Sequence, residues 1–313
     1  MAVLFTTRWK KDTKRWLDAI EGALPDFEVF NGADDDVVVD WDAIEYALVW
    51  QPPSGMLHQC KNLEAVFNLG AGVDYVLEHS DLPTNVPLVR LVDPCLTEGM
   101  IEYVTHWVLH LHRGFGRYRG YQDEPKWRPH WYPRTKDRRV GILGLGALGG
   151  AAARQLTSLG FDVAGWSRSP KTIDGVTSFA GDDQLEAFLQ RTEILVCLLP
   201  LTPTTTGILN TKTLSQLPEG AQVINVARGG HVVDDDLIKV LDSDHLAGAV
   251  LDVFHEEPLP LEHPFWQNPK VTITPHVASL TNPETACGEI AKDIKLMQVG
   301  QSARYVVDRA VGY

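Results

Sequence analysis

The sequence predicts two α/β domains, each built on a parallel sheet, with a cleft between them. Three observations support this prediction. The chain has 313 residues, about twice the usual domain length of ~150 residues. Short apolar, β-branched runs alternate along it with segments whose apolar residues recur at helical spacing. One such run leads directly into a glycine-rich turn at residues 144–149.

The composition narrows the classes of ligand that the protein can attract. Hydrophobic residues make up 44% of the chain and charged residues 22%, as in ordinary globular proteins. Lys and Arg number 28 against 41 for Asp and Glu, which gives a formal net charge of −13. A field of this sign repels phosphate backbones and anionic lipids. We therefore expect neither nucleic acid nor a membrane as a partner, and an anionic ligand must find its positive charge locally.

The cysteines and the hydropathy pattern bear on the compartment. Cys60, Cys95, Cys197 and Cys287 lie far apart and form no C-x-x-C pair, so we expect neither a disulfide framework nor a zinc site. The first residues lack a signal-peptide core, and no apolar run reaches the roughly 18 residues that a membrane span needs. These features predict a cytoplasmic protein.

The first part of the chain is expected to alternate strands and helices. Strands are predicted at residues 2–6, 46–50, 63–69 and 86–91, and a helix at 12–24. Residues 97–118 contain no proline and carry apolar side chains at helical intervals, which predicts one long helix. A segment rich in Trp, Arg and Pro follows this helix.

A second α/β series begins at Arg139. Its strands are predicted at residues 140–143, 162–166, 194–199, 222–225, 248–251 and 271–274. Its helices are predicted at residues 149–159 and 235–241, and a last helix, at 283–300, could return to the first domain.

The turn at residues 144–149 has the pattern G-x-G-x-x-G between a predicted strand and a predicted helix. In such a turn the first glycine permits a tight bend, the second lets a pyrophosphate approach the backbone, and the third lets helix and strand pack closely. The amides of the helix N-terminus then face the phosphates. We therefore predict a dinucleotide site, in preference to a plain tight turn. Its residues are Gly144, Gly146, Ala147, Leu148 and Gly149.

The end of the next strand selects between the nicotinamide cofactors. NAD sites place Asp or Glu about 20 residues after the last glycine, where it binds the ribose hydroxyls. This chain has no acid there and reads Trp166, Ser167, Arg168 and Ser169, with Lys171 close behind. Hydroxyl and guanidinium groups bind a 2′-phosphate, which a carboxylate would repel. Unless this is only a basic surface turn, the cofactor is NADPH or NADP, with NADH as the weaker alternative.

Three polar motifs end further predicted strands, at the edge where open α/β sheets bind ligands. They are NVARGG at residues 225–230, LDVFHEEPL at 251–259 and TPHVAS at 274–279. With ALVWQPP at 47–53, LGAGVD at 69–74, WSR at 166–168 and VDR at 307–309, they make the chain resemble the D-2-hydroxyacid dehydrogenase family over essentially its whole length. The resemblance is greatest to the glyoxylate/hydroxypyruvate reductase branch. It implies two Rossmann-like or flavodoxin-like domains with an interdomain cleft.

Carried over by position, the resemblance implies that Arg228, Glu257 and His276 are catalytic. Histidine changes its charge near neutral pH, so His276 suits the donor of the proton that a reduced carbonyl oxygen takes up. Glu257 would favour the imidazolium and hold its tautomer. We prefer it to Glu256 because the family's acid directly precedes the proline, here Pro258. Arg228 would bind the substrate carboxylate and the developing oxyanion.

The resemblance also implies residues that contact substrate and cofactor. Small residues leave room for close backbone approach, so the amides of Gly70, Ala71 and Gly72 would hold the substrate carboxylate. Trp50 either walls the pocket or packs in the core. Residues at strand ends are expected to line the cofactor: Leu199, Pro200, Ala227, Arg228, Asp252 and His276.

These assignments divide the chain into a substrate-binding domain, 1–98 plus 282–313, and an NADP-binding domain, 99–281. The implied activity is NADPH-dependent reduction of glyoxylate to glycolate and of hydroxypyruvate to D-glycerate. The implied assembly is a homodimer whose interface contains the long helix and the Trp-rich segment. The alternatives are another 2-keto acid reductase, acting for example on phenylpyruvate or pyruvate, and a non-catalytic NAD(P)-sensing protein.

His106, His110 and His112 lack an acidic third ligand at a familiar spacing, so we assign them to packing or to the interface and expect no metal.

Overall fold

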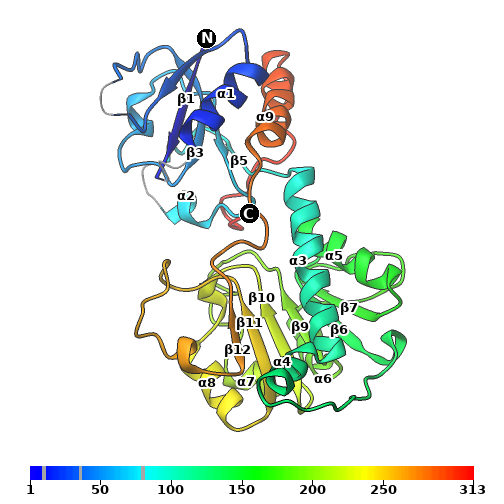
Figure 1. Ribbon diagram of the computed structural model, residues 1–313. Helices are drawn as coiled ribbons and strands as arrows, with labels where there is room; N and C mark the ends of the chain where they lie inside the picture. The colour runs from blue at the N-terminus through cyan, green and yellow to red at the C-terminus, as the bar shows by residue number, and fades with distance from the viewer. Residues whose placement is uncertain (9–11, 35–36, 79–81) are drawn as a thin grey trace. The chain divides into compact units, whose positions relative to one another are not determined.

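The computed structural model describes residues 1–8, 12–34, 37–78 and 82–313. The chain divides into two compact units. Unit 1 contains Met1–Leu96 and Leu280–Tyr313, and unit 2 contains Thr97–Ser279 (Figure 1). The junctions fall close to the sequence-based boundaries at 98/99 and 281/282. Each unit contains a parallel sheet covered by helices, which confirms the predicted α/β class.

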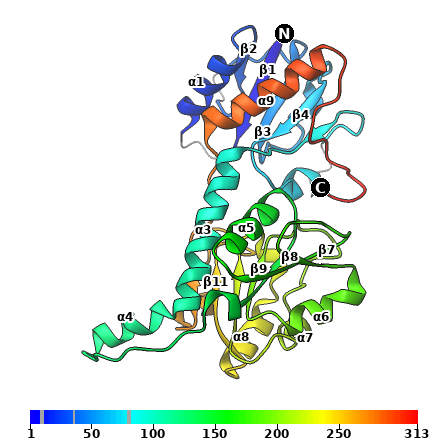
Figure 2. The same cartoon turned by 90° about the vertical axis from the view of Figure 1, so that its right-hand side faces the viewer.

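The sheet of unit 1 has five strands in the order β2-β1-β3-β4-β5. They are β1 (Ala2–Thr7), β2 (Glu28–Asn31), β3 (Ile44–Trp50), β4 (Ala65–Asn68) and β5 (Leu88–Val89). Successive strand side chains point to opposite faces, so Val3 and Phe5 join one core cluster while Ala2 and Leu4 join another. Both faces are therefore buried, as is usual for a parallel sheet. Helices α1 (Thr13–Ala23) and α9 (Pro283–Gln298) pack side by side over one face (Figure 2), and α2 (Asp74–Glu78) contributes Val76 to the other.

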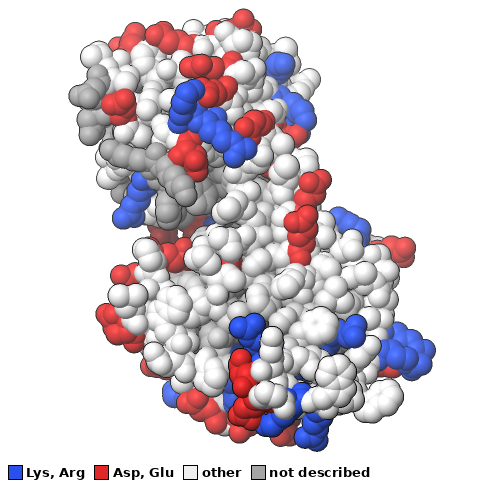
Figure 3. Space-filling view, viewed as in Figure 1, with Lys and Arg blue, Asp and Glu red and all other residues white. Residues whose placement is uncertain are grey.

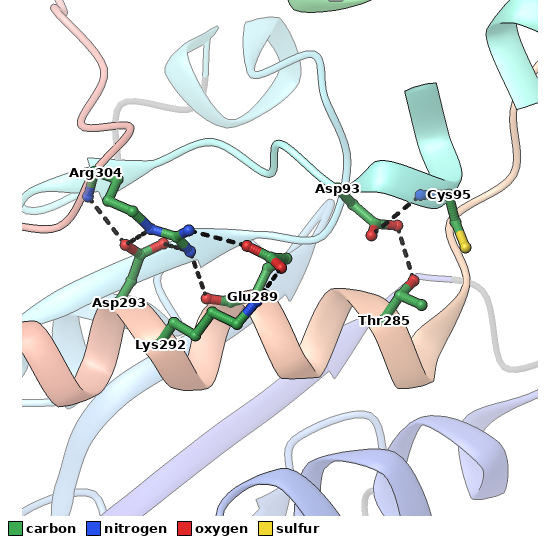
Figure 4. Close-up of polar contacts among 7 residues, drawn as sticks. All are labelled: Asp93, Cys95, Thr285, Glu289, Lys292, Asp293 and Arg304. Atoms are coloured by element: carbon green, nitrogen blue, oxygen red, sulfur yellow. Dashed lines mark hydrogen bonds and ion pairs between the residues drawn. The ribbon is translucent and has the colours of Figure 1, made fainter. Parts of the chain in front are cut away.

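The C-terminal segment is held to the rest of unit 1 by a partly buried ion-pair cluster (Figure 4). The Arg304 guanidinium donates from Nε to Asp293 Oδ1 at 2.7 Å and lies 3.0 Å from Glu289 Oε2. Asp293 is only 4% exposed, so breaking this pair would leave a buried charge without its partner. The segment then runs along the sheet edge, where the Val307 amide donates to the Leu88 carbonyl at 2.8 Å.

The sheet of unit 2 has seven strands in the order β12-β11-β10-β9-β6-β7-β8. They are β6 (Arg139–Leu143), β7 (Asp162–Ser167), β8 (Val176–Ala180), β9 (Ile194–Cys197), β10 (Ala221–Asn225), β11 (Leu246–Leu251) and β12 (Val271–Ile273). The helices around it are α3 (Pro94–Arg113), α4 (Phe115–Asp123), α5 (Ala147–Ser158), α6 (Leu185–Gln190), α7 (Thr211–Leu214) and α8 (Asp234–Asp242). The strand order reverses between β6 and β9, and such a switch point opens a ligand crevice at the carboxyl ends of the strands.

Three sequence-based assignments of elements were wrong or incomplete. The predicted single helix at 97–118 is two helices, α3 and α4, because Gly114 adopts a left-handed conformation with φ of 64° and ends the first one. Strands β2 and β8 were not predicted. Both are edge strands whose side chains are mostly half-buried or exposed, so neither presents the continuous apolar run of a central strand.

The surface carries both signs of charge. On the face that Figure 3 draws, basic side chains lie interspersed with acidic ones. Within the parts of the chain that the structure describes, every helix is too short or too polar to cross a membrane.

Candidate active site

The glycine-rich turn of unit 2 joins β6 to α5 and needs two of its glycines for steric reasons. Gly144 has a φ of 99°, and a Cβ there would lie 2.6 Å from the Leu198 carbonyl oxygen. A Cβ on Gly149 would lie 1.8 Å from the Gly144 carbonyl oxygen. A Cβ on Gly146 would meet no described atom within 4 Å. The turn is thus closed on its protein side and open at Gly146, where a pyrophosphate would approach.

The backbone amides of this turn are available to an anion. The N–H groups of residues 145–148 have no acceptor within the described ranges. They stand at the N-terminus of α5, a helix of 12 residues whose dipole favours negative charge at that end. These amide donors and the dipole of α5 both suit the pyrophosphate of a dinucleotide.

The turn after β7 separates structural residues from exposed ones. Trp166 is buried; its Nε1 donates to the Gly181 carbonyl at 2.8 Å, and its own carbonyl accepts from the Gly144 amide at 2.8 Å. Its ring is therefore a core side chain, and its backbone carbonyl braces the glycine turn. Ser167 is also buried, and its hydroxyl donates to the Ser169 carbonyl at 2.8 Å. Arg168 and Ser169 are exposed at the strand end.

The segment after β9 lies against the glycine turn. The Leu198 amide donates to the Leu143 carbonyl at 2.8 Å, which holds this strand end beside the end of β6. Leu199 is buried and Pro200 is half-buried. That they contact the cofactor stays a prediction.

His276 and Glu257 form a hydrogen-bonded pair. His276 Nδ1 lies 2.7 Å from Glu257 Oε2, while Glu257 Oε1 accepts from the Phe254 amide at 2.9 Å. Burial alone would raise the pKa of Glu257, but these two hydrogen bonds and the charges of His276 and Arg228 hold it below its ordinary value. The second imidazole nitrogen, Nε2, has no hydrogen-bond partner within the described ranges.

Arg228 belongs to the turn that follows β10, and this turn touches the loop that carries Glu257. Its Nη1 donates to the Ala227 carbonyl at 2.7 Å, and its carbonyl accepts from Asn225 Nδ2 at 2.9 Å. A Cβ on Gly229 would lie 1.9 Å from the Phe254 carbonyl carbon, so only glycine lets the two backbones meet here. The structure thus brings Arg228, Glu257 and His276 together from three distant motifs.

Asp252 has a role that the sequence did not reveal. It is fully buried, and Oδ1 accepts from Thr274 Oγ1 at 2.5 Å and from the Val277 amide at 2.9 Å, while Oδ2 accepts from the Ala278 amide at 2.8 Å. The Asp252 carbonyl accepts the His276 amide at 2.8 Å. Although we expected Asp252 to line the cofactor, its carboxylate builds the turn that presents His276. An acid directly after an apolar strand is the signal that could have suggested this.

The predicted carboxylate-binding loop lies in unit 1, directly after β4. Asn68 is buried, and its Nδ2 donates to the carbonyls of Gly70 and Gly72 at 2.8 and 2.9 Å. A Cβ on Gly70 would lie 2.0 Å from the ring of Trp50, so the half-buried indole packs directly on this loop. The amides of residues 71–73 have no acceptor within the described ranges. Sequence reasoning missed Asn68, which shapes the loop.

The histidines of α3 pack against aromatic rings. The rings of His106 and His110 are 6.0 Å apart, and His112 is buried edge-on between Tyr132 and Phe161. Among the residues that the structure describes, no three His, Cys, Asp or Glu side chains are placed to hold a metal ion.

A glycine turn suited to a dinucleotide, together with an acid-paired histidine and an arginine at the same sheet edge, defines a nicotinamide-dependent oxidoreductase. The family model for the NAD binding domain of the D-isomer specific 2-hydroxyacid dehydrogenases matches residues 105–278. The chain belongs to this family.

Individual relatives match over nearly the whole length. A protein of Serratia proteamaculans called glyoxylate/hydroxypyruvate reductase A is 45% identical over 309 residues, covering 96% of this chain and 97% of its own. A D-isomer specific 2-hydroxyacid dehydrogenase of Xanthobacter autotrophicus, solved with NADPH and MES, is 42% identical with a TM-score of 0.95, covering 100% of this chain and 99% of its own. An NADPH-dependent glyoxylate/hydroxypyruvate reductase of Sinorhizobium meliloti, solved with NADP and sulfate, is 39% identical with a TM-score of 0.94 and the same coverage.

Proposed function

We propose that this protein is an NADPH-dependent reductase of small 2-keto acids that converts glyoxylate to glycolate and hydroxypyruvate to D-glycerate. The observation that carries the proposal is the His276–Glu257 pair, 2.7 Å apart, in contact with the Arg228 turn and in the same unit as the glycine-rich turn. Relatives with this activity in their names, similar over nearly the full chain, support the choice of substrate.

The proposed chemistry assigns one task to each side chain of the trio. NADPH, when bound, supplies the hydride that reduces the carbonyl carbon. His276 gives a proton from Nε2 to the carbonyl oxygen, since Nδ1 is engaged by Glu257. Glu257 keeps that tautomer and stabilises the imidazolium before the proton leaves. Arg228 offers a planar, permanently charged group to the carboxylate and to the charge that develops on the oxygen.

The remaining contacts divide between the units. In unit 2, the amides of residues 145–148 would hold the pyrophosphate, and Ser167 and Arg168 would admit the 2′-phosphate that distinguishes NADPH from NADH. In unit 1, the amides of residues 71–73 would hold the keto acid carboxylate, with the Trp50 ring beside them. Unit 1 is accordingly our proposed substrate-binding domain and unit 2 our proposed NADP-binding domain.

We also propose a cytoplasmic homodimer. The segment at residues 114–133, the arm, extends from unit 2 (Figure 2) and carries Trp127 and Trp131, whose side chains are fully exposed at 103% and 101%. Helix α4 buries none of its residues, and Arg117, Arg119 and Arg128 make the arm basic on a chain of net charge −13. An acidic second copy complements such a surface. The four free thiols suit a reducing compartment.

The activity is tested by following NADPH oxidation against a panel of 2-keto acids, repeated with NADH. We expect glyoxylate and hydroxypyruvate to give higher kcat/KM than pyruvate or phenylpyruvate. A preference for phenylpyruvate or pyruvate would assign the protein to another 2-keto acid reductase, and no turnover with any keto acid would favour a non-catalytic NAD(P)-binding role.

The dimer is tested separately by light scattering, which should give about twice 34.8 kDa for the native chain and a lower mass for Trp127→Ser/Trp131→Ser. A native monomer at micromolar concentration would contradict the dimer alone.

A further inference from the structure

We propose that His231 is a positioning residue, which holds the Arg228 turn against the segment after β9 through two hydrogen bonds of one neutral imidazole tautomer. The inference rests on the proposed function, because it assigns to Arg228 the binding of the keto acid. His231 ends the 3₁₀ turn Gly229–His231 and is fully buried.

The imidazole is fully buried and both ring nitrogens face backbone groups. Nδ1 lies 3.2 Å from the Arg228 nitrogen and 3.1 Å from the Arg228 oxygen, and Nε2 lies 3.3 Å from the Pro200 oxygen. The backbone of His231 is also anchored, since its carbonyl accepts from the Leu209 amide at 2.8 Å. The side chain is therefore held from several directions.

These partners select the tautomer. Pro200 offers only a carbonyl oxygen, so Nε2 bonds to it only when Nε2 carries the proton. A neutral imidazole has one ring proton, which leaves a lone pair on Nδ1, and that lone pair accepts the Arg228 amide. The opposite tautomer would donate from Nδ1 to the Arg228 oxygen at 3.1 Å, but that oxygen already accepts from Asn225 Nδ2. It would also turn the Nε2 lone pair toward the Pro200 oxygen and remove the acceptor of the Arg228 amide. A buried polar group without its partner is costly, so the first tautomer is favoured.

The backbone amide and the backbone carbonyl of Arg228 are therefore both held by buried side chains. His231 accepts its amide, and Asn225, also fully buried, donates to its carbonyl at 2.9 Å. With the backbone held on both sides, the guanidinium starts from a defined position beside Glu257. Through Pro200, the same imidazole links this position to the strand end beside the glycine turn, where the cofactor is proposed to bind.

Three substitutions separate the two hydrogen bonds. His231→Asn places an amide oxygen where Nδ1 stands and keeps the acceptor for Arg228, while His231→Gln places an amide nitrogen near Nε2 and keeps the donor to Pro200. His231→Leu removes both at similar volume. The matched control is His245→Leu, because His245 also has a buried ring nitrogen but precedes β11, at the opposite end of the strands from the site. Each variant is assayed for kcat and KM of glyoxylate at saturating NADPH, for NADPH affinity and for melting temperature.

We expect Leu and Gln to raise KM for glyoxylate about 10-fold, the equivalent of roughly 1.4 kcal/mol, and to lower kcat as well. Asn should stay within about 3-fold of the native KM. The control should leave KM unchanged. A purely structural role predicts that His231→Leu has the highest melting temperature of the three variants. It also predicts that KM is unchanged in every variant that folds.

Two results overturn the inference: native kinetics in His231→Leu, or equal impairment of His231→Asn and His231→Gln. If the Leu variant does not fold, the comparison of Asn with Gln still decides. Absence of turnover in the native protein would instead overturn the proposed function, so the two failures are distinguishable.

Discussion

Two loops of this protein have consecutive backbone amides without an acceptor in the described ranges, and the two loops are built differently. In unit 2, residues 144–149 take their shape from backbone geometry. The turn requires a φ of 99° at Gly144, and the Gly144 carbonyl leaves no room for a Cβ on Gly149. In unit 1, the loop after β4 takes its shape from side chains. Asn68 bonds two of its carbonyls, and the Trp50 ring packs on Gly70.

The following helices differ as well. The unit 2 loop opens α5, with 12 residues, whereas the unit 1 loop opens α2, with 5 residues. A longer helix presents a larger dipole, which suits the two charges of a pyrophosphate, while a few amides suffice for one carboxylate. The comparison predicts that changes at His276 or in the turn after β7 alter kcat or cofactor choice, and that changes in the unit 1 loop alter KM for the keto acid.

The largest effect is expected at His276. Replacing it by Ala removes the proton donor, so kcat should fall by roughly 10²- to 10⁴-fold while NADPH binds with native affinity. Stopped-flow turnover and fluorescence titration of NADPH measure the two quantities. A near-normal kcat would show that another group delivers the proton.

The next effect concerns the turn after β7, also in unit 2. Ser167→Asp combined with Arg168→Ala places a carboxylate where the 2′-phosphate would lie and removes a charge-assisted partner. The ratio of kcat/KM for NADPH over NADH should fall by about 10- to 100-fold. Lys171→Ala is the control for a basic side chain near that turn. The same ratio in native and double-variant protein would mean that this turn does not recognise the phosphate.

In unit 1, Asn68→Leu sharpens the comparison. It leaves the carbonyls of Gly70 and Gly72 without their buried donor, so the loop loses its shape and KM for glyoxylate should rise about 10-fold. We expect kcat to stay within about 3-fold. Asn62→Ala removes an exposed amide that donates to the Asp42 carbonyl at 2.8 Å in the same unit, and it should change neither constant. If Asn68→Leu lowered kcat alone, the assignment of keto acid binding to the unit 1 loop would be wrong.

The smallest effect is on the pH profile. The pKa of Glu257 lies below its ordinary value, so the carboxylate stays ionised at neutral pH and the pairing is lost only as the pH falls through that lowered pKa. Reduction should therefore fall as the pH is lowered through that pKa, because the protonated carboxyl no longer holds His276 as a charged partner. Glu257→Gln has no carboxyl to titrate there, so its reduction rate should be lower at neutral pH and should not fall over the same acidic range.

The adjacent carboxylate supplies the control for that change. Glu256 is exposed, and Glu256→Gln should keep the pH profile of the native protein. The same profile in both variants would show that general charge, and not the contact with His276, is responsible.

Features that depend on neighbouring residues were predictable from the sequence. The α/β class follows from alternating apolar periods, and the glycine turn from steric demands within six consecutive residues. Arg228, Glu257 and His276 were assigned through the resemblance to the family, and their proximity was expected because parallel strands end at a common edge. The helical periodicity failed at Gly114, whose left-handed conformation divides α3 from α4.

Only the tertiary structure decided which polar side chains hold the turns of the candidate site in place. Asp252 bonds amides 25 and 26 residues further along the chain, and His231 bonds a carbonyl 31 residues earlier. Trp166 was assigned to the cofactor, but its ring completes the core. A buried hydrogen bond forms between groups that folding brings together, so its partners are set by the packing of the sheet and leave no periodic pattern in the sequence.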